Sequence, residues 1–363
     1  LIINYVKELN YFRKLILISV ISFLASFAII INNFYYINFL AIINNLFFVP
    51  LVSFIIFPLI LITFIFQYLE PILEISLNVM ENISNILSNI KIFYFGFPKT
   101  NLFLIIIYYI FLFLYSLNFK KRYFIFLLVI IVIIFNIPKT DKSYYIYFTD
   151  VGQGDSILIT TPNLNKKIII DTGGTTNFNK EKWKKRNNEY HLSNNLISFY
   201  HSIGINKVDY MFLTHGDSDH LGEANNLIEG IKVNKVYINK NRCSYLENKL
   251  IKKQKIDKKH FNIDGIKIYS LNKINNEDEN KSSLVLLFEI YNYKILFMGD
   301  ATKEVEKSLL MDKEIKNIDI LKVGHHGSNT STSEEFINYI KPKYSIISVK
   351  KNNKFHHPSE ETL

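Results

Sequence analysis

The sequence predicts an α-helical membrane region followed by an α/β domain of layered sheets flanked by helices. No charged side chain occurs between residues 15 and 69, whereas most of the 42 Lys and Arg and the 32 Asp and Glu lie beyond residue 138. After Pro138, short β-branched and aromatic runs alternate with helical patterns, which is typical of layered α/β domains. We expect a helical membrane region over residues 1–138 and a second domain over residues 139–363.

Apolar runs organise the first region, because a bilayer is crossed by about 17–25 apolar residues. They are residues 15–31, 47–69, 102–117 and 123–137. Pro50 and Pro58 interrupt the second run. This predicts either broken or interfacial helices around a water-lined path, or ordinary proline kinks. Residues 70–91 are amphipathic and predict a helix that lies along the membrane or packs as a partner helix.

Basic residues near the span ends predict the orientation, because Lys and Arg in short loops stay in the cytoplasm. The loop of Lys120, Lys121 and Arg122 lies between the last two apolar runs, which we expect to form a tight helical pair. If this loop is cytoplasmic, the last span leads outward. The second domain is then extracytoplasmic.

The second domain is expected to alternate strands and helices. The predicted strands are residues 144–148, 156–160, 168–170, 210–213, 236–238, 266–269, 284–290, 294–297, 318–323 and 344–349. The predicted helices are residues 193–203, 222–229, 303–310 and 333–340.

Composition limits the chemistry. The single cysteine, Cys243, excludes an internal disulfide framework and a cysteine-based zinc site. A metal would therefore use His and carboxylate ligands. The net charge of +10 favours acidic partners such as anionic lipid or nucleic acid, or else reflects a solubilising face. No Gly-rich phosphate loop with a lysine occurs, so ATP hydrolysis is not expected.

The sharpest motif is Thr-His-Gly-Asp-Ser-Asp-His at residues 214–220, directly after an apolar strand. Two His and two Asp in one loop can converge on metal ions. Asp300, His325 and His326 also follow apolar runs, and Asp300 could bridge two ions with its two oxygens. Asp171 ends another strand and could orient a ligand histidine from behind. These residues together predict a binuclear metal site.

The order of these motifs resembles the metallo-β-lactamase fold. Asp-Val-Gly-Gln-Gly-Asp-Ser at residues 150–156 and Lys-Val-Gly-His-His-Gly-Ser at residues 322–328 are similar to the carboxyl-terminal domain of the ComEC DNA-uptake channels. Residues 41–58 are similar to that family's competence region. The resemblance implies a fragment of a multi-pass protein of the bacterial cytoplasmic (inner) membrane, without the family's amino-terminal soluble domain and earlier spans. It implies single-stranded DNA, the lipid bilayer and other uptake proteins as partners.

The ligand set departs from the wider fold at two places. Asp217 stands where many members have a histidine, and the region of residues 280–283 lacks another. One metal position therefore exchanges imidazoles for oxygen ligands, which favours Mn²⁺ but leaves Zn²⁺ possible. We expect two divalent ions, manganese or zinc. The expected ligands are His215, Asp217, Asp219, His220, Asp300 and His325. Asp155 and Asp171 are expected to support these ligands without binding the metal.

Two metal ions about 3.5–4 Å apart can position a nucleophile and stabilise both oxygens of a phosphodiester displacement. Asp219, His326, Ser328 and His357 are therefore candidate catalytic residues, although His326, Ser328 and His357 could equally be structural. Basic residues around an aromatic can contact phosphates and stack a base. They predict nucleic-acid binding at Lys182, Trp183, Lys184, Lys185 and Arg186.

The expected function is DNA uptake during natural transformation, with a nuclease domain that degrades one strand. The role in DNA uptake is what the resemblance implies. Composition and motif spacing by themselves support a membrane-anchored binuclear hydrolase. Two alternatives stay open. In one, the metallo domain is catalytically silent and grips DNA or scaffolds a channel. In the other, the chain is a membrane-tethered hydrolase of small molecules.

Overall fold

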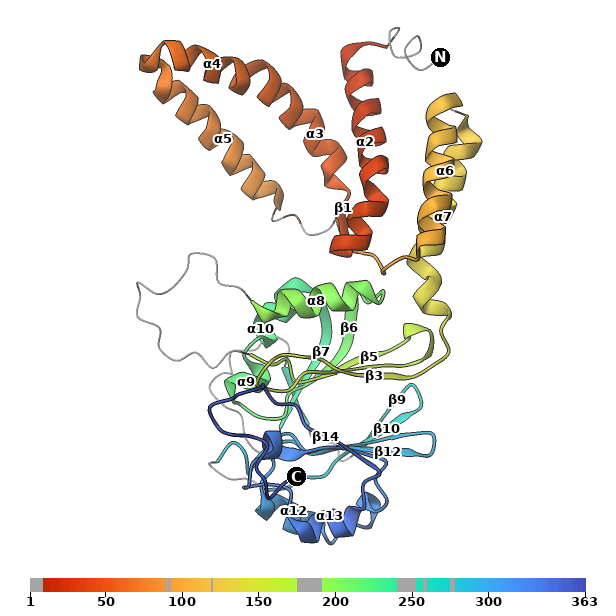
Figure 1. Cartoon of the computed structure of the whole chain (residues 1–363), viewed down its shortest axis with the longest axis vertical. Helices are drawn as coiled ribbons and strands as arrows, with labels where there is room; N and C mark the ends of the chain where they lie inside the picture. Colours follow the sequence, from red (N-terminus) through yellow and green to blue (C-terminus); the bar gives the residue numbers. More distant parts are fainter. Residues whose placement is uncertain are drawn as a thin grey trace. The chain divides into compact units, whose positions relative to one another are not determined.

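A computed structural model gives the fold of the chain (Figure 1). It describes residues 9–88, 90, 93–118, 120–174, 191–239, 253–256, 260–274 and 278–363. The chain divides into two compact units, Leu1–Pro138 with His201–Gly204 and Lys139–Tyr200 with Ile205–Leu363. Each unit has a hydrophobic core of its own.

The first unit is helical, with one small antiparallel sheet of β1 and β2. Its elements are α2 (Tyr11–Phe34), β1 (Tyr36–Asn38), α3 (Leu40–Leu51), the π-helical turn η1 (Val52–Ile56), α4 (Phe57–Ile65), the 3-10 turn η2 (Gln67–Leu69), α5 (Glu70–Ser88), β2 (Tyr94–Gly96), α6 (Leu102–Asn118) and α7 (Lys121–Asn136). The core of this unit joins α2, α6 and α7. In it the buried Tyr108 hydroxyl donates to the Leu24 carbonyl at 2.6 Å.

Apolar helices form over all the predicted spans. Tyr11–Phe34, Leu40–Ile65 and Lys121–Thr140 are long and apolar enough to cross a membrane, and Leu102–Leu117 is a shorter apolar helix. The second span is one continuous helix, Leu40–Ile65, through Pro50 and Pro58, which agrees with the alternative of proline kinks and not with that of broken helices. Between these prolines the chain widens into η1, where the Phe57 N–H bonds the Val52 carbonyl. A π-helical turn of this kind absorbs the irregularity that the prolines introduce.

The second unit contains two six-stranded sheets. One has the order β3 (Tyr145–Phe148), β4 (Ile157–Thr160), β5 (Lys167–Ile170), β6 (Lys207–Phe212), β7 (Lys232–Asn239), β8 (Lys253–Ile256). The other has the order β14 (Tyr344–Ile346), β13 (Ile320–Lys322), β12 (Tyr293–Phe297), β11 (Leu286–Ile290), β10 (Ile266–Ser270), β9 (His260–Ile263). The unit's longer helices are α8 (Leu192–Ser202), α10 (Ala224–Gly230), α12 (Lys303–Leu309) and α13 (Glu334–Ile340).

The two sheets pack face to face, with helices outside them (Figure 1). Alternate side chains of β4, β5 and β11, such as Ile157, Ile168 and Phe288, fill the layer between the sheets. The remaining side chains of β11 and β12, such as Leu287 and Leu296, pack against α12 and α13. Strands of the second sheet are thus apolar on both faces, which explains their nearly continuous hydrophobic runs.

The predicted strands and helices of this unit are confirmed, with boundary shifts of a few residues. The sequence reasoning missed β8, β9 and the short helix α9 (Ser218–Leu221). α9 lies inside the His/Asp motif, where polar residues gave no apolar periodicity. The order of strands, sheets and helices agrees with the predicted layered α/β domain.

The packing between the sheets predicts the effect of a core truncation. Phe288 is fully buried and its ring lies 5.2 Å from the Phe297 ring and 6.3 Å from the Phe212 ring. We expect Phe288→Ala to lower the free energy of unfolding by about 3–5 kcal/mol. Met311→Ala, at an 89% exposed position, is the control and should change it by less than about 0.5 kcal/mol. Thermal melts of the detergent-solubilised chain measure the difference, and equal melting curves would contradict the assigned core.

Candidate metal centre

Loops that follow strands of both sheets carry the predicted ligands. His215 follows β6 of the first sheet, Asp300 follows β12 of the second, and His325 follows β13. β5 and β6 are parallel, as are β12 and β13. Neighbouring parallel strands deliver their carboxyl ends to one edge of a sheet, where polar loops can converge.

Close backbone packing positions α9, which carries Asp219 and His220. The Thr172 N–H donates to the His220 carbonyl at 2.7 Å, and the Asp155 N–H donates to the Asp219 carbonyl at 3.3 Å. Gly154 has a φ of +122°, and a Cβ at this position would collide with the Asp219 carbonyl. The glycine therefore lets the residue 150–156 loop lie directly against the helix that carries two ligand candidates.

Asp300 lies at the centre of the histidines. Its Oδ1 is 3.1 Å from His220 Nε2. Its Oδ2 is 3.8 Å from His215 Nε2, 3.7 Å from His326 Nε2 and 3.9 Å from His325 Nε2. Gly299 has a φ of +54°, and a Cβ there would collide with Ser283 Oγ, which accepts the Asp300 N–H at 3.0 Å. Four imidazoles thus present the same ring nitrogen to one carboxylate.

Asp171 fixes the proton position on two of these imidazoles. Its carboxylate accepts the Thr214 N–H at 2.8 Å, the Thr214 hydroxyl at 2.7 Å and His220 Nδ1 at 2.9 Å. Because the Thr214 hydroxyl hydrogen is committed to Asp171, Thr214 Oγ1 accepts from His215 Nδ1 at 3.0 Å. His220 and His215 therefore donate from Nδ1 and turn Nε2 toward Asp300.

His325 and His326 follow the same rule with other acceptors. His326 Nδ1 donates to the Ser348 carbonyl at 2.9 Å. His325 Nδ1 lies 2.9 Å from Thr330 Oγ1, whose own hydrogen is donated to Ser328 Oγ at 3.0 Å. Thr330 therefore acts as the acceptor for His325, and both Nε2 atoms point into the site.

The inward-facing nitrogens lie close to one another and to carboxylates. His220 Nε2 and His326 Nε2 are 3.2 Å apart. His220 Nε2 is also 3.1 Å from Asp300 Oδ1, and His326 Nε2 is 3.4 Å from Asp219 Oδ2. Burial would lower the pKa of both imidazoles, but the neighbouring carboxylates, Asp300 first, raise it above its usual value, so a proton lies here that a cation can replace. Among the described residues, Asp155 Oδ1 and His215 Nε2 are buried without a hydrogen-bond partner. Unpaired buried polar atoms are costly. A divalent cation satisfies this arrangement, so the residues present fit metal ions.

One group of potential ligands is fully buried. Single ligand atoms of Asp155, His220, Asp300 and His326 all lie within 4.8 Å of one another. Asp219 Oδ2 is 3.4 Å from His326 Nε2, at the edge of this group. His215 Nε2 and the half-exposed Asp217 Oδ2 are 3.5 Å apart, and the His215 ring lies 4.2 Å from the His220 ring. Asp300 is thus within 4 Å of donors from both halves of the motif at residues 214–220 and from the residue 325–326 turn.

Buried charges keep the carboxylates ionised. Burial would raise the pKa of Asp300, but His220 and then His326 hold that pKa well below its usual value. Burial would also raise the pKa of Asp155, and Lys322 followed by His326 lowers it. Lys322 Nζ is 2.8 Å from Asp155 Oδ2, and both side chains are buried. Lys322 occupies one Asp155 oxygen and leaves Oδ1 for the site.

The structure brings most predicted site residues together. His326, expected as a catalytic or structural residue, lies in the buried ligand group, as does Asp155, expected behind the ligands. Ser328 is buried; its N–H donates to the His325 carbonyl at 2.8 Å, and its side chain reaches the His325 ring through Thr330. The His357 ring lies 5.9 Å from the His325 ring, at the rim.

The residues predicted to bind nucleic acid lie outside the part of the chain that the structure describes. They are Lys182, Trp183, Lys184, Lys185 and Arg186, and their role remains a prediction.

Sequence reasoning gave no role to several residues that support the site. Thr214, Ser283 and Thr330 are hydroxyl residues in loops with many others, so nothing in their spacing distinguished them. Lys322 did carry a signal, because it is a lone charge in the apolar run of residues 320–323, and a fully buried Lys is almost always paired.

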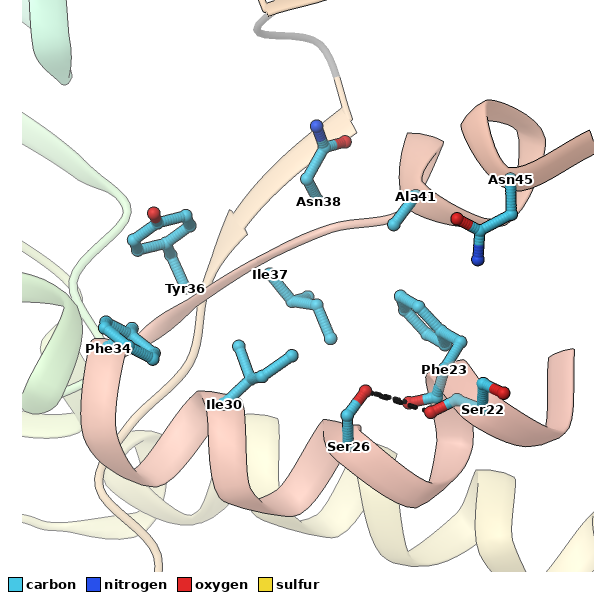
Figure 2. Close-up of a pocket in the computed structure, with 10 residues that line it drawn as sticks. All are labelled: Ser22, Phe23, Ser26, Ile30, Phe34, Tyr36, Ile37, Asn38, Ala41 and Asn45. Atoms are coloured by element: carbon cyan, nitrogen blue, oxygen red, sulfur yellow. Dashed lines mark hydrogen bonds between the residues drawn. The ribbon is translucent and has the colours of Figure 1, made fainter. Parts of the chain in front are cut away.

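The helical unit contains a separate cavity of about 360 Å³ (Figure 2). Its polar lining residues include Ser22, Ser26, Asn38 and Asn45, among mostly apolar neighbours. The Ser26 hydroxyl bonds the Ser22 and Phe23 carbonyls of its own helix. No residue that lines this cavity is acidic, basic or a histidine, so the candidate for chemistry is the centre around Asp300.

Thr330 provides a test of how His325 is oriented. Thr330→Val removes the acceptor for His325 Nδ1 and keeps the side-chain shape, so we expect about 10- to 100-fold weaker binding of a divalent ion, as is usual for a residue that orients a ligand histidine. Calorimetric titration with Mn²⁺ and Zn²⁺ measures this. Thr330→Ser keeps the hydroxyl and is the matched control. Indistinguishable affinities of the Val and Ser variants would show that Thr330 does not orient the ligand.

Two family models match the chain. The model described as Metallo-beta-lactamase superfamily matches residues 149–349, and the model described as Competence protein matches residues 3–122. Both matches follow the order of the two units along the chain.

Several curated and solved proteins are similar. ComE operon protein 3 of Bacillus subtilis is 34% identical over 243 residues, which cover 63% of this chain and 31% of that protein. Recombination protein 2 of Haemophilus influenzae is 29% identical over 199 residues, covering 55% of this chain and 23% of that protein. The chain thus spans about a third or less of the length of these relatives. The metallo-beta-lactamase fold protein YhfI from Bacillus subtilis overlaps 60% of this chain and 88% of its own, with a TM-score of 0.40 and 10% identity.

Proposed function

The chain belongs to the metallo-β-lactamase superfamily and, through its competence region, to the ComEC family of competence proteins, and on that premise we propose that it acts in DNA uptake. We propose that the second unit is a binuclear metal-dependent nuclease that degrades one DNA strand during entry. Single-stranded DNA and the lipid bilayer are the partners in this proposal, together with other proteins of the uptake machinery.

The observation that carries the proposal is the set of imidazole Nε2 atoms around Asp300. Each of these histidines donates from Nδ1 to a protein acceptor, so each Nε2 faces the inside of the site. Asp300 adds two carboxylate oxygens to this set. Metal ions that displaced the Nε2 protons would find imidazole nitrogens and carboxylate oxygens already converging, which is the donor set of a hydrolytic metal centre.

We assign the donors to two positions that share Asp300. His215, Asp217 and His325 belong to the more exposed position. Asp219, His220, Asp155 and His326 border the buried one. Divalent ions held by such donors would activate water at neutral pH and neutralise a phosphodiester.

The chain's own residues orient the proposed ligands and exclude water from the buried side of the site. Asp171 and Thr330 keep the imidazoles turned inward, and Lys322 keeps Asp155 ionised and fixed. His357, at the rim beside His325, is placed to contact the leaving group or a phosphate oxygen. The buried side of the site, with His220 and Asp300 almost inaccessible to solvent, excludes bulk water from the reacting groups.

Asp300→Asn tests the centre. It removes the shared negative charge with almost no change of shape, so we expect cleavage of single-stranded DNA to fall by about 100-fold or more, together with loss of bound metal. Gel assays of a labelled oligonucleotide and metal analysis of the same preparation measure both. Glu304→Gln, a surface change at a 64% exposed side chain, is the control. Full cleavage by Asp300→Asn at ordinary metal concentration would reject the assignment.

The side of the membrane follows from the basic loop at Lys120, Lys121 and Arg122. We propose that this loop is cytoplasmic, so that the unit after Pro138 is extracytoplasmic in a multi-pass protein of the inner membrane. Long domains cross the membrane largely regardless of charge, so the short loop determines the orientation.

A reporter at the start of the second unit tests this orientation. A single cysteine introduced at Lys142, in a chain with Cys243→Ser, should react with a membrane-impermeant maleimide on spheroplasts. A cysteine introduced at Lys120 should react only after lysis. The opposite labelling would invert the topology and remove the basis for degradation during entry.

A further inference from the structure

An aromatic side chain projects from a loop at the rim of the metal centre. Phe355 is 55% exposed. Its ring is nearly parallel to the His357 ring, with an interplanar angle of 18° and centroids 5.8 Å apart. His357 in turn lies 5.9 Å from His325. The Phe355 ring is thus separated from a proposed ligand by a single imidazole.

The loop that carries Phe355 is held rigidly by one side chain. Asn353 Oδ1 accepts the Phe355 N–H and the His357 N–H, both at 3.0 Å. Asn353 Nδ2 donates to the Lys350 carbonyl at 3.0 Å and to the His357 carbonyl at 2.6 Å. Asn353 therefore ties the beginning of the loop to its end, and Phe355 projects from a fixed backbone.

The same segment is fixed to the loop of the proposed ligands. The Ser359 N–H donates to the Gly327 carbonyl at 2.9 Å. Pro358 packs so closely on Gly327 that a Cβ at residue 327 would come within 2.7 Å of Pro358 Cβ. These contacts set the backbone of the Phe355 segment relative to the turn that carries His325 and His326.

The surroundings of Phe355 favour a charged, aromatic ligand. Lys350, Lys351 and Lys354 are exposed in the same loop, and cationic side chains beside a phosphodiester site contact phosphates. A phenyl ring that remains half exposed on a pinned loop contributes little to a core. Nucleobases stack on exposed aromatic rings of this kind, whatever their sequence.

We propose that Phe355, backed by His357, is a stacking platform for one base of single-stranded nucleic acid whose neighbouring phosphate lies at the metal centre. The inference rests on the proposed nuclease function and adds a binding subsite to it. An unstacked base can reach the ring, whereas a base paired in a duplex cannot. The platform therefore favours single strands.

The test is a double-mutant cycle between the protein and the nucleic acid. One partner is the full-length chain with Phe355→Ala. The other is a single-stranded oligonucleotide with one abasic nucleotide, which is moved stepwise along the strand. Binding is measured by fluorescence anisotropy in excess chelator, so that neither metal nor cleavage contributes. Phe355→Tyr, which keeps the ring, and Tyr291→Ala, which removes an exposed aromatic at the β11–β12 turn, are the matched variants.

We expect the wild-type chain to bind the oligonucleotide more weakly by about 5- to 100-fold when one particular base is missing. Phe355→Ala should bind the intact strand equally weakly and should no longer distinguish the intact from the abasic strand. The Phe355→Tyr chain keeps the discrimination, and so does Tyr291→Ala. A Phe355→Ala chain that still loses affinity on the same abasic strand would overturn the platform.

The binding and cleavage measurements together distinguish failure of the nuclease proposal from failure of the stacking proposal. If Phe355 and one base are coupled in chelator but metal restores no cleavage, the platform stands and the domain binds DNA without cutting it. If cleavage is metal-dependent but no base is coupled to Phe355, the nuclease stands and the platform is rejected.

Discussion

The carboxylate of Asp171 is the constraint on which the site geometry depends. Asp171 is fully buried and ends β5 in a left-handed conformation, with a φ of 56°. Its two oxygens receive donors from Thr214 and His220, so it determines one imidazole directly and His215 through the threonine. A residue outside the proposed ligand set thus decides which nitrogen two of the proposed ligands turn inward. Such supporting contacts account for much of the affinity of a metal site.

Much of the fold could be predicted, because its strands have a simple physical pattern. Runs such as residues 157–160 and 284–290 are largely apolar, since they are buried on both faces. β8 was missed because its sequence, Lys-Gln-Lys-Ile, contains a single apolar residue. α9 could not be predicted, because its four residues have no apolar period and its position depends on Gly154, more than sixty residues earlier in the chain.

The spacing of motifs along the sequence predicted which side chains converge, but not how each one is placed in the site. The motif at residues 214–220 and the later Asp300 predicted convergence, and these side chains do converge. The separate positions of His325 and His326 could not be derived from spacing. Both have left-handed backbone angles, with φ of 47° and 53°, so the alternation that an extended chain imposes on neighbours is lost. This turn brings both rings to the same carboxylate.

The buried ligand group is drawn equally from the two sheets. Asp155 and His220 come from the half of the unit that builds the first sheet, and Asp300 and His326 come from the half that builds the second. A cation held there would join two halves that are also held by the apolar layer around Phe212 and Phe288 and by polar contacts such as the Lys322–Asp155 ion pair. Its binding energy would oppose any opening of that layer, because the separated halves offer only half a coordination shell. The same ion would then take part in catalysis and stabilise the packing of the two sheets against each other.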